Sequence, residues 1–237
     1  MEYPHITILT PVYQRHNFLK LYLSGIVSQE YPKDKISILI HECRSNEPFI
    51  RDLEGIRHNI SPIQITHVVD SSRRTIGEKR NYLVKHCQTE YFMFFDSDDI
   101  YMPTALSHTV KGLMESDRGF AGSTQMLFCY PLLEFQTRMM TCGDDPHMIH
   151  EATICSTKSF FKKYKLKFQK SNQGESRYLL ENVPNTEILL TNIVYLMMCL
   201  CHGDNTIPKD IFLDKKYQVD TEYHEDFKQF ILSQINC

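Results

Sequence analysis

The sequence predicts an α/β fold with a mixed, mostly parallel sheet flanked by helices. Apolar runs of strand length alternate with segments of helical periodicity through residues 1–100. One of these runs, residues 91–95, stops at three carboxylates within four positions, Asp96, Asp98 and Asp99. Ligands bind outside the carboxyl ends of the strands in open α/β sheets, so this acidic turn is the first candidate site.

Four strands and four helices are expected before Gly119. The strands are apolar runs bounded by turn or polar residues, at 5–13, 36–40, 63–69 and 91–95. The helices have apolar residues three and four apart, at 18–27, 47–58, 75–88 and 103–117. Strands and helices that alternate at these intervals predict parallel pairing with right-handed crossovers.

The pattern changes after Gly119, because regular helices no longer separate the strands. Two strands, a polar loop and a terminal amphipathic helix are expected, at 120–130, 132–140, 141–151 and 221–235. Residues 183–201 predict two strands that meet near Thr191 and Asn192, with a buried helix as the alternative.

Composition narrows the class of protein. A net charge of −3, with acids and bases mixed along the chain, argues against nucleic-acid binding. The first residues lack the basic start and long apolar core of a signal peptide. The longest apolar run, 188–201, is too short to span a bilayer. The eight cysteines show no paired metal spacing and are predicted to be reduced, so a cytoplasmic protein is expected.

The acidic turn is a candidate metal site. Residues two apart in extended chain face the same way, so Asp96 and Asp98 can converge on one hard cation that prefers oxygen ligands. The alternative is an acidic connection between a strand and a helix, in which Asp99 only helps the helix begin.

Two segments carry a resemblance to a known family. They are ITILTPVYQRHNFLKLYLSGIVSQEYP, which begins at Ile6, and GEKRNYLVKHCQTEYFMFFDSDDIYMP, which begins at Gly77. Together they resemble the family 2 glycosyltransferases of the GT-A fold, and the resemblance runs to about Asn205. It implies an inverting transferase that uses a nucleotide-diphosphate sugar and a divalent metal, Mn or Mg.

The resemblance also implies nucleotide-binding residues. Pro11 and Tyr13 match its first turn, and Arg80 matches an arginine that can reach the phosphates. Lys79 lies beside Arg80 and is a weaker candidate. Glu42 stands where the family usually has an aspartate that accepts the uracil N–H, although the family's Asp-Asp-Gly-Ser run is absent here. A capping role for Glu42 and a core role for Tyr13 are the alternatives.

The resemblance also implies the metal ligands and the catalytic base. Asp98 is expected at the metal, Asp96 at the metal or the ribose, and His202 as a further metal ligand. Glu175 is expected to be the general base that activates the acceptor hydroxyl, although Ser176 replaces the second acid of the family's pair. Three other acids are alternative bases: Glu181, Asp144 and Asp145.

The predicted function is thus the metal-dependent, inverting transfer of a sugar, with a UDP-sugar favoured, to a glycan, protein or lipid-linked acceptor. Two rival hypotheses are a sugar nucleotidyltransferase and a non-catalytic descendant that binds a nucleotide or a partner. The first is disfavoured because residues 11–15 contain no glycine.

A domain division follows from the resemblance. Residues 1–205 are expected to form the transferase domain, with a nucleotide-binding half at 1–100 and an acceptor half at 101–205. Residues 206–237 are expected to be an extension whose helix packs on its own domain or forms a homodimer contact.

One basic and aromatic stretch is not explained by the transferase motifs. Residues 158–170 carry six lysines in thirteen positions. The segment is expected either to contact a phosphorylated or lipid-linked acceptor or an anionic membrane surface, or to be an ordinary amphipathic segment with lysines in water.

Overall fold

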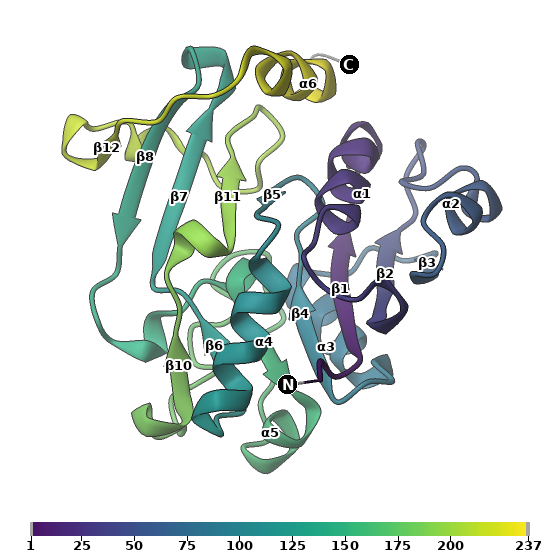
Figure 1. The fold of residues 1–237 in the computed structure, drawn as a ribbon, viewed down its shortest axis with the longest axis vertical. Helices are drawn as coiled ribbons and strands as arrows, with labels where there is room; N and C mark the ends of the chain where they lie inside the picture. Colours follow the sequence, from purple (N-terminus) through teal and green to yellow (C-terminus); the bar gives the residue numbers. More distant parts are fainter. Residues whose placement is uncertain (1, 236–237) are drawn as a thin grey trace.

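A seven-stranded sheet forms the centre of the computed structural model, which describes residues 2–235 (Figure 1). The strand order is β10-β6-β9-β4-β1-β2-β3. Strand β9 is antiparallel to both of its neighbours and the other pairs are parallel. The strands are β1 Ile6–Val12, β2 Ile36–Cys43, β3 Gln64–Asp70, β4 Tyr91–Phe94, β6 Phe120–Gly122, β9 Cys155–Thr157 and β10 Ile188–Leu190.

A second sheet of five strands stands beside the first, in the order β12-β8-β7-β11-β5 (Figure 1). Its strands are β5 Ile100–Tyr101, β7 Gln125–Tyr130, β8 Gln136–Thr141, β11 Met197–Leu200 and β12 Gln218–Val219. Strand β5 follows the acidic turn directly, and it pairs antiparallel with β11. The second sheet therefore reaches the carboxyl end of β4.

Helices cover the sheets. They are α1 Leu19–Val27, α2 Leu53–Asn59, α3 Ile76–His86, α4 Ala105–Ser116, α5 Lys158–Lys163 and α6 Glu225–Ile235. Helix α3 packs on β1 and β2 and begins with a capping box, in which Thr75 and Glu78 satisfy each other's backbone N–H groups. None of the helices described between residues 2 and 235 is long and apolar enough to cross a membrane.

The central strand β4 is buried on both faces, as its continuous apolar run predicts. Phe92 and Phe94 belong to one hydrophobic cluster, whereas Met93 and Phe95 belong to the other. All four side chains are fully buried. Because successive residues alternate between faces, β4 is fixed in register, and the turn after it emerges at a defined place.

The structure confirms the predicted fold class and the two-strand interpretation of residues 183–201. Several boundaries were wrong. Helix α2 begins at Leu53 and not at 47, because Asp52 caps it by accepting from the Gly55 N–H. The strand expected at 120–130 is two strands that join different sheets. The strands β5 and β9 were not predicted.

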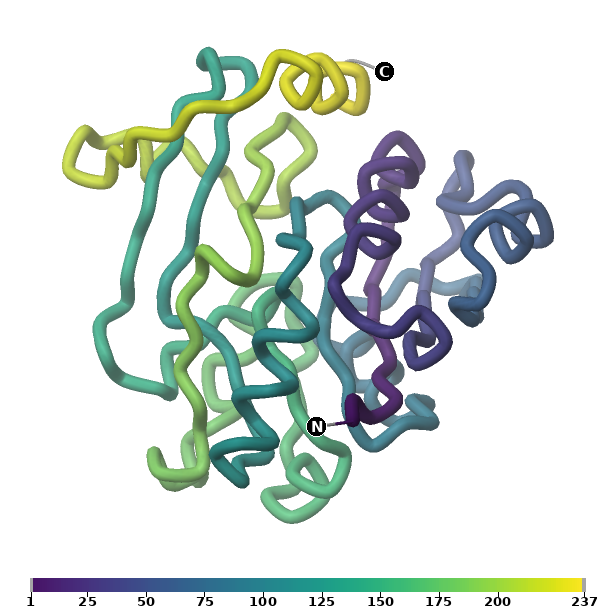
Figure 2. Tube along the Cα trace, in the orientation of Figure 1, coloured from purple at the N-terminus to yellow at the C-terminus, as the bar shows by residue number. Residues whose placement is uncertain are grey.

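The terminal helix α6 packs on α1 and on the second sheet (Figure 2). Ile231 is fully buried in a cluster with Phe18, Leu21, Cys129 and Leu200. The end of the chain thus contacts both halves of the predicted transferase domain. The division at residue 205 stays a prediction, as does the homodimer contact.

Candidate active site

Two cavities meet at the carboxyl ends of β1 and β4. The first, of about 310 Å³, we call the basic cavity, and it is lined mainly by Pro11, Tyr13, Arg15, Arg73, Arg74 and Lys79. The second, of about 280 Å³, we call the carboxylate cavity, and it is lined among others by Asp99, Glu151, Glu175, Phe128 and Phe212. Both cavities are also lined by Arg80, Asp96 and Asp98. The predicted acidic turn therefore lies at the junction between a cationic and an anionic compartment.

Asp98 is held by two cationic or polar side chains. Its Oδ2 accepts from Arg15 Nε at 2.6 Å and lies 3.2 Å from His202 Nε2. Desolvation opposes ionisation of Asp98, but the hydrogen bond with His202 and the charge of Arg15 outweigh it and lower its pKa to about 2. Asp98 is therefore an anion at neutral pH. It is in contact with His202, which was predicted to bind the same metal ion.

The loop that carries His202 is fixed from both sides. The His202 backbone N–H donates to Asn205 Oδ1 at 2.8 Å, and its ring lies 4.5 Å from the ring of Phe18. Arg15 Nη2 donates to the Asp204 carbonyl at 2.6 Å. Arg15 thus links the turn after β1 to residues near the other end of the chain. Arg15 was not predicted to be a site residue, although it lies in the segment that begins at Ile6.

Asp99 has a structural role, because it connects the acidic turn to β11. It is buried, and its Oδ1 accepts from the backbone N–H of Leu200 at 3.1 Å. Helix α4 begins only at Ala105, so the hypothesis that Asp99 helps a following helix begin is wrong. Asp99 instead ties the acidic turn to β11, which brings His202 toward Asp98.

Arg80 connects Asp96 to Glu175. The guanidinium is buried, with Nη2 3.0 Å from Asp96 Oδ1 and Nε 3.1 Å from Glu175 Oε1. It also lies 4.7 Å from the ring centroid of Phe94. Its Nη1 is buried and has no hydrogen-bond partner among residues 2–235. Because buried donors are nearly always paired, this N–H suits an oxygen atom of a bound ligand.

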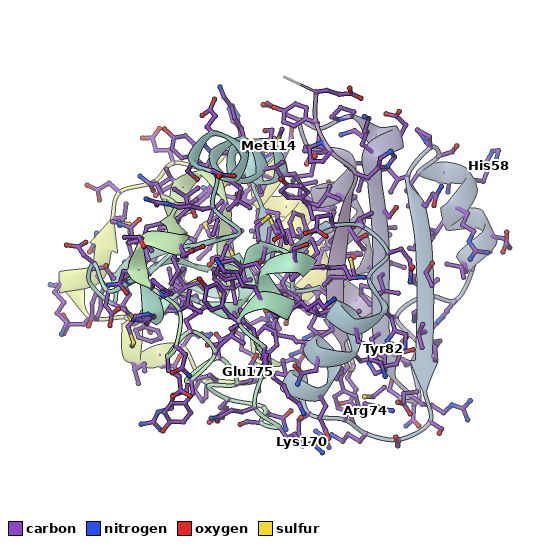
Figure 3. All side chains as sticks on the ribbon, turned by 90° about the horizontal axis from the view of Figure 1, so that it is seen from below. His58, Arg74, Tyr82, Met114, Lys170 and Glu175 are labelled. Atoms are coloured by element: carbon purple, nitrogen blue, oxygen red, sulfur yellow. The ribbon has the colours of Figure 1, made fainter. Side chains whose placement is uncertain are left out.

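Glu175 is brought to the site by a close approach between a loop and α3. The Gly77 N–H donates to the Ser171 carbonyl and the Ile76 N–H to Asn172 Oδ1, each at 3.0 Å. A Cβ atom at Gly77 would lie 1.7 Å from the Gln169 carbonyl oxygen. Only glycine allows this contact. Figure 3 shows Glu175 on the same side of the molecule as Lys170 and Arg74, opposite Met114.

Burial and a neighbouring acid set the state of Glu175. Desolvation raises its pKa, the charge of Arg80 opposes that rise, and the negative charge of Glu151 adds to it. Glu151 is held in turn by Ser176, whose hydroxyl donates to it at 2.6 Å. Glu151 was missed because it lies in a polar segment without periodicity, and only the folded chain brings it to the cavity.

Not all of the predicted nucleotide-binding residues line the same cavity. Pro11 and Tyr13 line the basic cavity, where Arg73 lies 4.5 Å from the Tyr13 ring centroid. Glu42 is buried, accepts from the Phe49 N–H at 2.9 Å, lies 2.8 Å from His67 Nε2, and lines neither cavity.

Lys79 and the three alternative bases also differ in whether they line a cavity. Lys79 lines the basic cavity and donates to the Val12 carbonyl at 2.8 Å, and burial lowers its pKa to about 8. The alternative bases are exposed and line neither cavity: Glu181, Asp144 and Asp145.

The candidate metal ligands form a pair and not a triad. Among residues 2–235, no group of three or more His, Cys, Asp and Glu side chains is arranged to hold a metal ion. Asp98 and His202 are in contact, whereas Asp96 is paired with Arg80. The available protein ligands are therefore one carboxylate and one imidazole.

The mixed, mostly parallel sheet with an acidic turn after its central strand is a GT-A fold, which this chain shares with solved glycosyltransferase structures. Residues 7–175 match the model of the family named glycosyl transferase family 2, and the chain belongs to this family.

Curated relatives are much longer than this chain. A probable glucomannan 4-beta-mannosyltransferase of Oryza sativa subsp. japonica is 27% identical over 170 residues, which are 68% of this chain and 28% of the relative. The poly(ribitol-phosphate) beta-N-acetylglucosaminyltransferase TarS of Staphylococcus aureus is 22% identical over 93 residues, 39% of this chain and 16% of its own length. The chain thus spans less than a third of either protein.

Solved structures share the fold at low identity. A crystal structure of residues 1–349 of S. aureus TarS with UDP has a TM-score of 0.65 at 12% identity, covering 83% of this chain and 60% of that one. The mannosyltransferase PcManGT from Pyrobaculum calidifontis, in complex with GDP-Man and Mn²⁺, has a TM-score of 0.65 at 15% identity. The match covers 90% of this chain and 59% of PcManGT.

Replacing Gly77 tests the close approach between α3 and the loop that leads to Glu175. In Gly77→Ala the new methyl group overlaps the Gln169 carbonyl, so the loop must move and the free energy of unfolding is expected to fall by about 1–3 kcal/mol. Denaturant unfolding measures this. The control is Gly25→Ala, whose Cβ would lie 3.9 Å from its nearest neighbour, and which is expected to be neutral or stabilising. Equal effects of the two substitutions would contradict the account.

Proposed function

We propose that this chain transfers a sugar from a nucleotide-diphosphate sugar to an acceptor hydroxyl. The observation that carries the proposal is the junction of the two cavities at Arg80, Asp96 and Asp98. In this proposal the nucleotide diphosphate occupies the basic cavity, the acceptor occupies the carboxylate cavity, and the sugar lies between them. Membership of glycosyl transferase family 2 supports this assignment.

The basic cavity suits a diphosphate. Arg73, Arg74 and Lys79 line it, and Arg80, whose buried Nη1 has no hydrogen-bond partner among residues 2–235, lines both cavities. Guanidinium groups match phosphate geometry with parallel hydrogen bonds. Tyr13 offers an aromatic face to the base. The neighbouring structures were solved with UDP and with GDP-Man, so both nucleotides are to be tested, UDP first.

Asp98 and His202 would hold a divalent cation. Mg²⁺ is usually bound through one or two carboxylates together with substrate phosphates, and carboxylates also suit Mn²⁺. Neutral imidazole is a common metal ligand, so the carboxylate of Asp98 and the imidazole of His202, which are in contact, fit such an ion. When bound, the cation would supply positive charge where the leaving diphosphate becomes negative. Asp96 is expected to remain with Arg80, close to the donor, rather than complete a three-residue metal site.

Glu175 is proposed as the general base. It would accept the proton of the acceptor hydroxyl, and Arg80 would hold its carboxylate in place. A base in one cavity and a leaving diphosphate in the other approach the transferred carbon from different sides. That arrangement favours direct displacement, which inverts the configuration of the sugar.

Donor turnover tests the proposal most simply. Wild-type protein is expected to hydrolyse or transfer from a UDP-sugar or GDP-sugar with Mn²⁺, and Asp98→Ala is expected to lose about 100-fold or more in rate. Chromatography of the released nucleotide diphosphate measures this, and ligand-induced stabilisation shows which nucleotide binds. Release of pyrophosphate from a mixture of UTP or GTP with a sugar 1-phosphate would support a nucleotidyltransferase instead, and binding without turnover would support a non-catalytic protein.

The pH profile tests Glu175. A base acts only when ionised, and the pKa of Glu175 is raised above the ordinary value of 4.5, so the rate is expected to fall as pH decreases through a value above 4.5. Glu175→Gln is expected to lower kcat about 10²- to 10⁴-fold and to abolish this acid limb. Glu181→Gln is the matched control, because Glu181 is exposed and outside both cavities. An unchanged acid limb in Glu175→Gln would rule Glu175 out as the base.

Arg15 is expected to weaken cation binding. It donates to the same Asp98 oxygen that a cation would use, and its charge repels the ion. Arg15→Gln is therefore expected to tighten the Mn²⁺ dissociation constant several-fold, as measured by electron paramagnetic resonance of free Mn²⁺. Arg57→Gln, an exposed arginine paired with Glu54, is the control. Weaker Mn²⁺ binding in Arg15→Gln would mean that Arg15 supports the site and does not compete for it.

A further inference from the structure

The basic and aromatic stretch noted in the sequence forms part of a concave surface away from the active site. We call it the lysine hollow, and its volume is about 430 Å³. Helix α3, helix α5 and the segment after α5 build it, through Asn81, Val84, Lys85, Lys158, Phe161, Lys162, Lys165, Leu166 and Lys167. No acidic side chain is among these nine residues.

Four of its lysines are free of acidic partners. Lys85, Lys162, Lys165 and Lys167 are exposed, and none of them forms a salt bridge within residues 2–235. The fifth, Lys158, donates to the Cys87 carbonyl at 2.6 Å. Neighbouring lysines outside the hollow are paired instead, Lys163 with Glu187 and Lys170 with Glu78. Positive charge is therefore concentrated in this hollow, although the whole chain has a net charge of −3.

The aromatic residues of the stretch have a different role from the lysines. Phe160, Phe161 and Phe168 are buried in the core against β4 and β6. Their packing fixes α5 and leaves the lysines on the outside. Lys85 and Lys162 also lie in the last turns of α3 and α5, where a cation is favoured by the helix dipole. The helix dipole therefore favours these two lysines at their positions, but it does not account for the absence of acids among the nine residues that line the hollow.

We propose that the lysine hollow is a docking surface for an anionic phospholipid bilayer. The hollow holds lysines and no arginine, and compact ammonium groups on flexible stems suit diffuse attraction to many headgroups better than recognition of one phosphate. Apolar and aromatic groups accompany the charge. Leu166 lines the hollow, and Tyr164 and the half-exposed Tyr178 line the adjoining cavity, to which Glu181 contributes one acid. Tyrosine is favoured at the boundary between water and lipid.

The position of the hollow is compatible with catalysis at the membrane. Lys158 donates its backbone N–H to Glu90, directly before β4, whereas Asp96 and Asp98 follow the other end of that strand. In Figure 1, α5 lies at the opposite end of the molecule from α6. The hollow therefore lies toward the amino end of β4, whereas the acidic turn follows the carboxyl end of that strand.

Vesicle binding tests this proposal. Wild-type protein is expected to co-sediment with vesicles of phosphatidylcholine and phosphatidylglycerol and not with phosphatidylcholine alone, and added salt is expected to release it. Each lysine removed is expected to lower the partition coefficient about fivefold, so the double variant Lys162→Gln, Lys167→Gln is expected to bind about 25-fold more weakly. These two lysines are exposed and outside the active site, so thermal stability and donor turnover are expected to be unchanged.

A matched variant supplies the control. Lys215→Gln, Lys216→Gln removes the same charge from exposed positions beside the second sheet, and it is expected to bind the vesicles as the wild type does. Equal losses in the two double variants would show attraction through total charge only and would overturn the assignment. No binding to anionic vesicles, or Lys162- and Lys167-dependent binding to soluble polyphosphate alone, would also overturn it. None of these outcomes depends on the proposed transferase activity.

Discussion

The buried guanidinium of Arg80 lies between Asp96, from the turn after β4, and Glu175, from a loop far along the chain. A buried charge is tolerated only when it is paired, and removing one partner of such a pair typically destabilises a protein by about 3–5 kcal/mol. The position of Arg80 therefore depends on both carboxylates, and their positions depend on it. The same group lines both cavities, so one network fixes the geometry at which they meet.

The rest of the fold supports this network from two directions. Helix α3 carries Arg80, and its Gly77 allows the loop of Glu175 to approach closely. On the other side, Asp99 holds β11 through the Leu200 N–H, and β11 leads to His202. Residues separated by about a hundred positions in the sequence are thus brought to one junction. Both sheets are needed to do this, because β4 belongs to the first and β11 to the second.

The sequence predicted the parts that local patterns encode. Continuous apolar runs revealed β1, β2, β3 and β4, and the end of β4 located the acidic turn. The short strands β5 and β9 were not predictable, because two or three residues show no periodicity and pair only in the folded sheet.

The hydrogen-bond partners of individual side chains could not be predicted either, because they too meet only in the folded chain. Glu42 meets His67 only because β2 and β3 pair in parallel, and this contact keeps Glu42 in the core. Arg15 lies in the turn after β1 and Glu151 begins a short 3₁₀ helix, and no local sequence pattern marked either residue. The residue types of the acidic turn were readable from the sequence, but the partner of each carboxylate was not.

Opposite charges are also separated within the active-site region itself. Cations line one cavity and acids line part of the other, and Asp98 stays ionised at their boundary with a pKa of about 2. This separation would place a diphosphate and a proton acceptor on different sides of one carbon atom. The account therefore depends on where a diphosphate binds relative to Asp98.

Anomalous diffraction from crystals grown with Mn²⁺ and UDP would examine that point directly. We expect a manganese peak in contact with Asp98 Oδ2 and His202 Nε2, with the diphosphate in the basic cavity and an oxygen atom near Arg80 Nη1. Manganese bound elsewhere, or a diphosphate seated in the carboxylate cavity beside Glu175, would contradict the account.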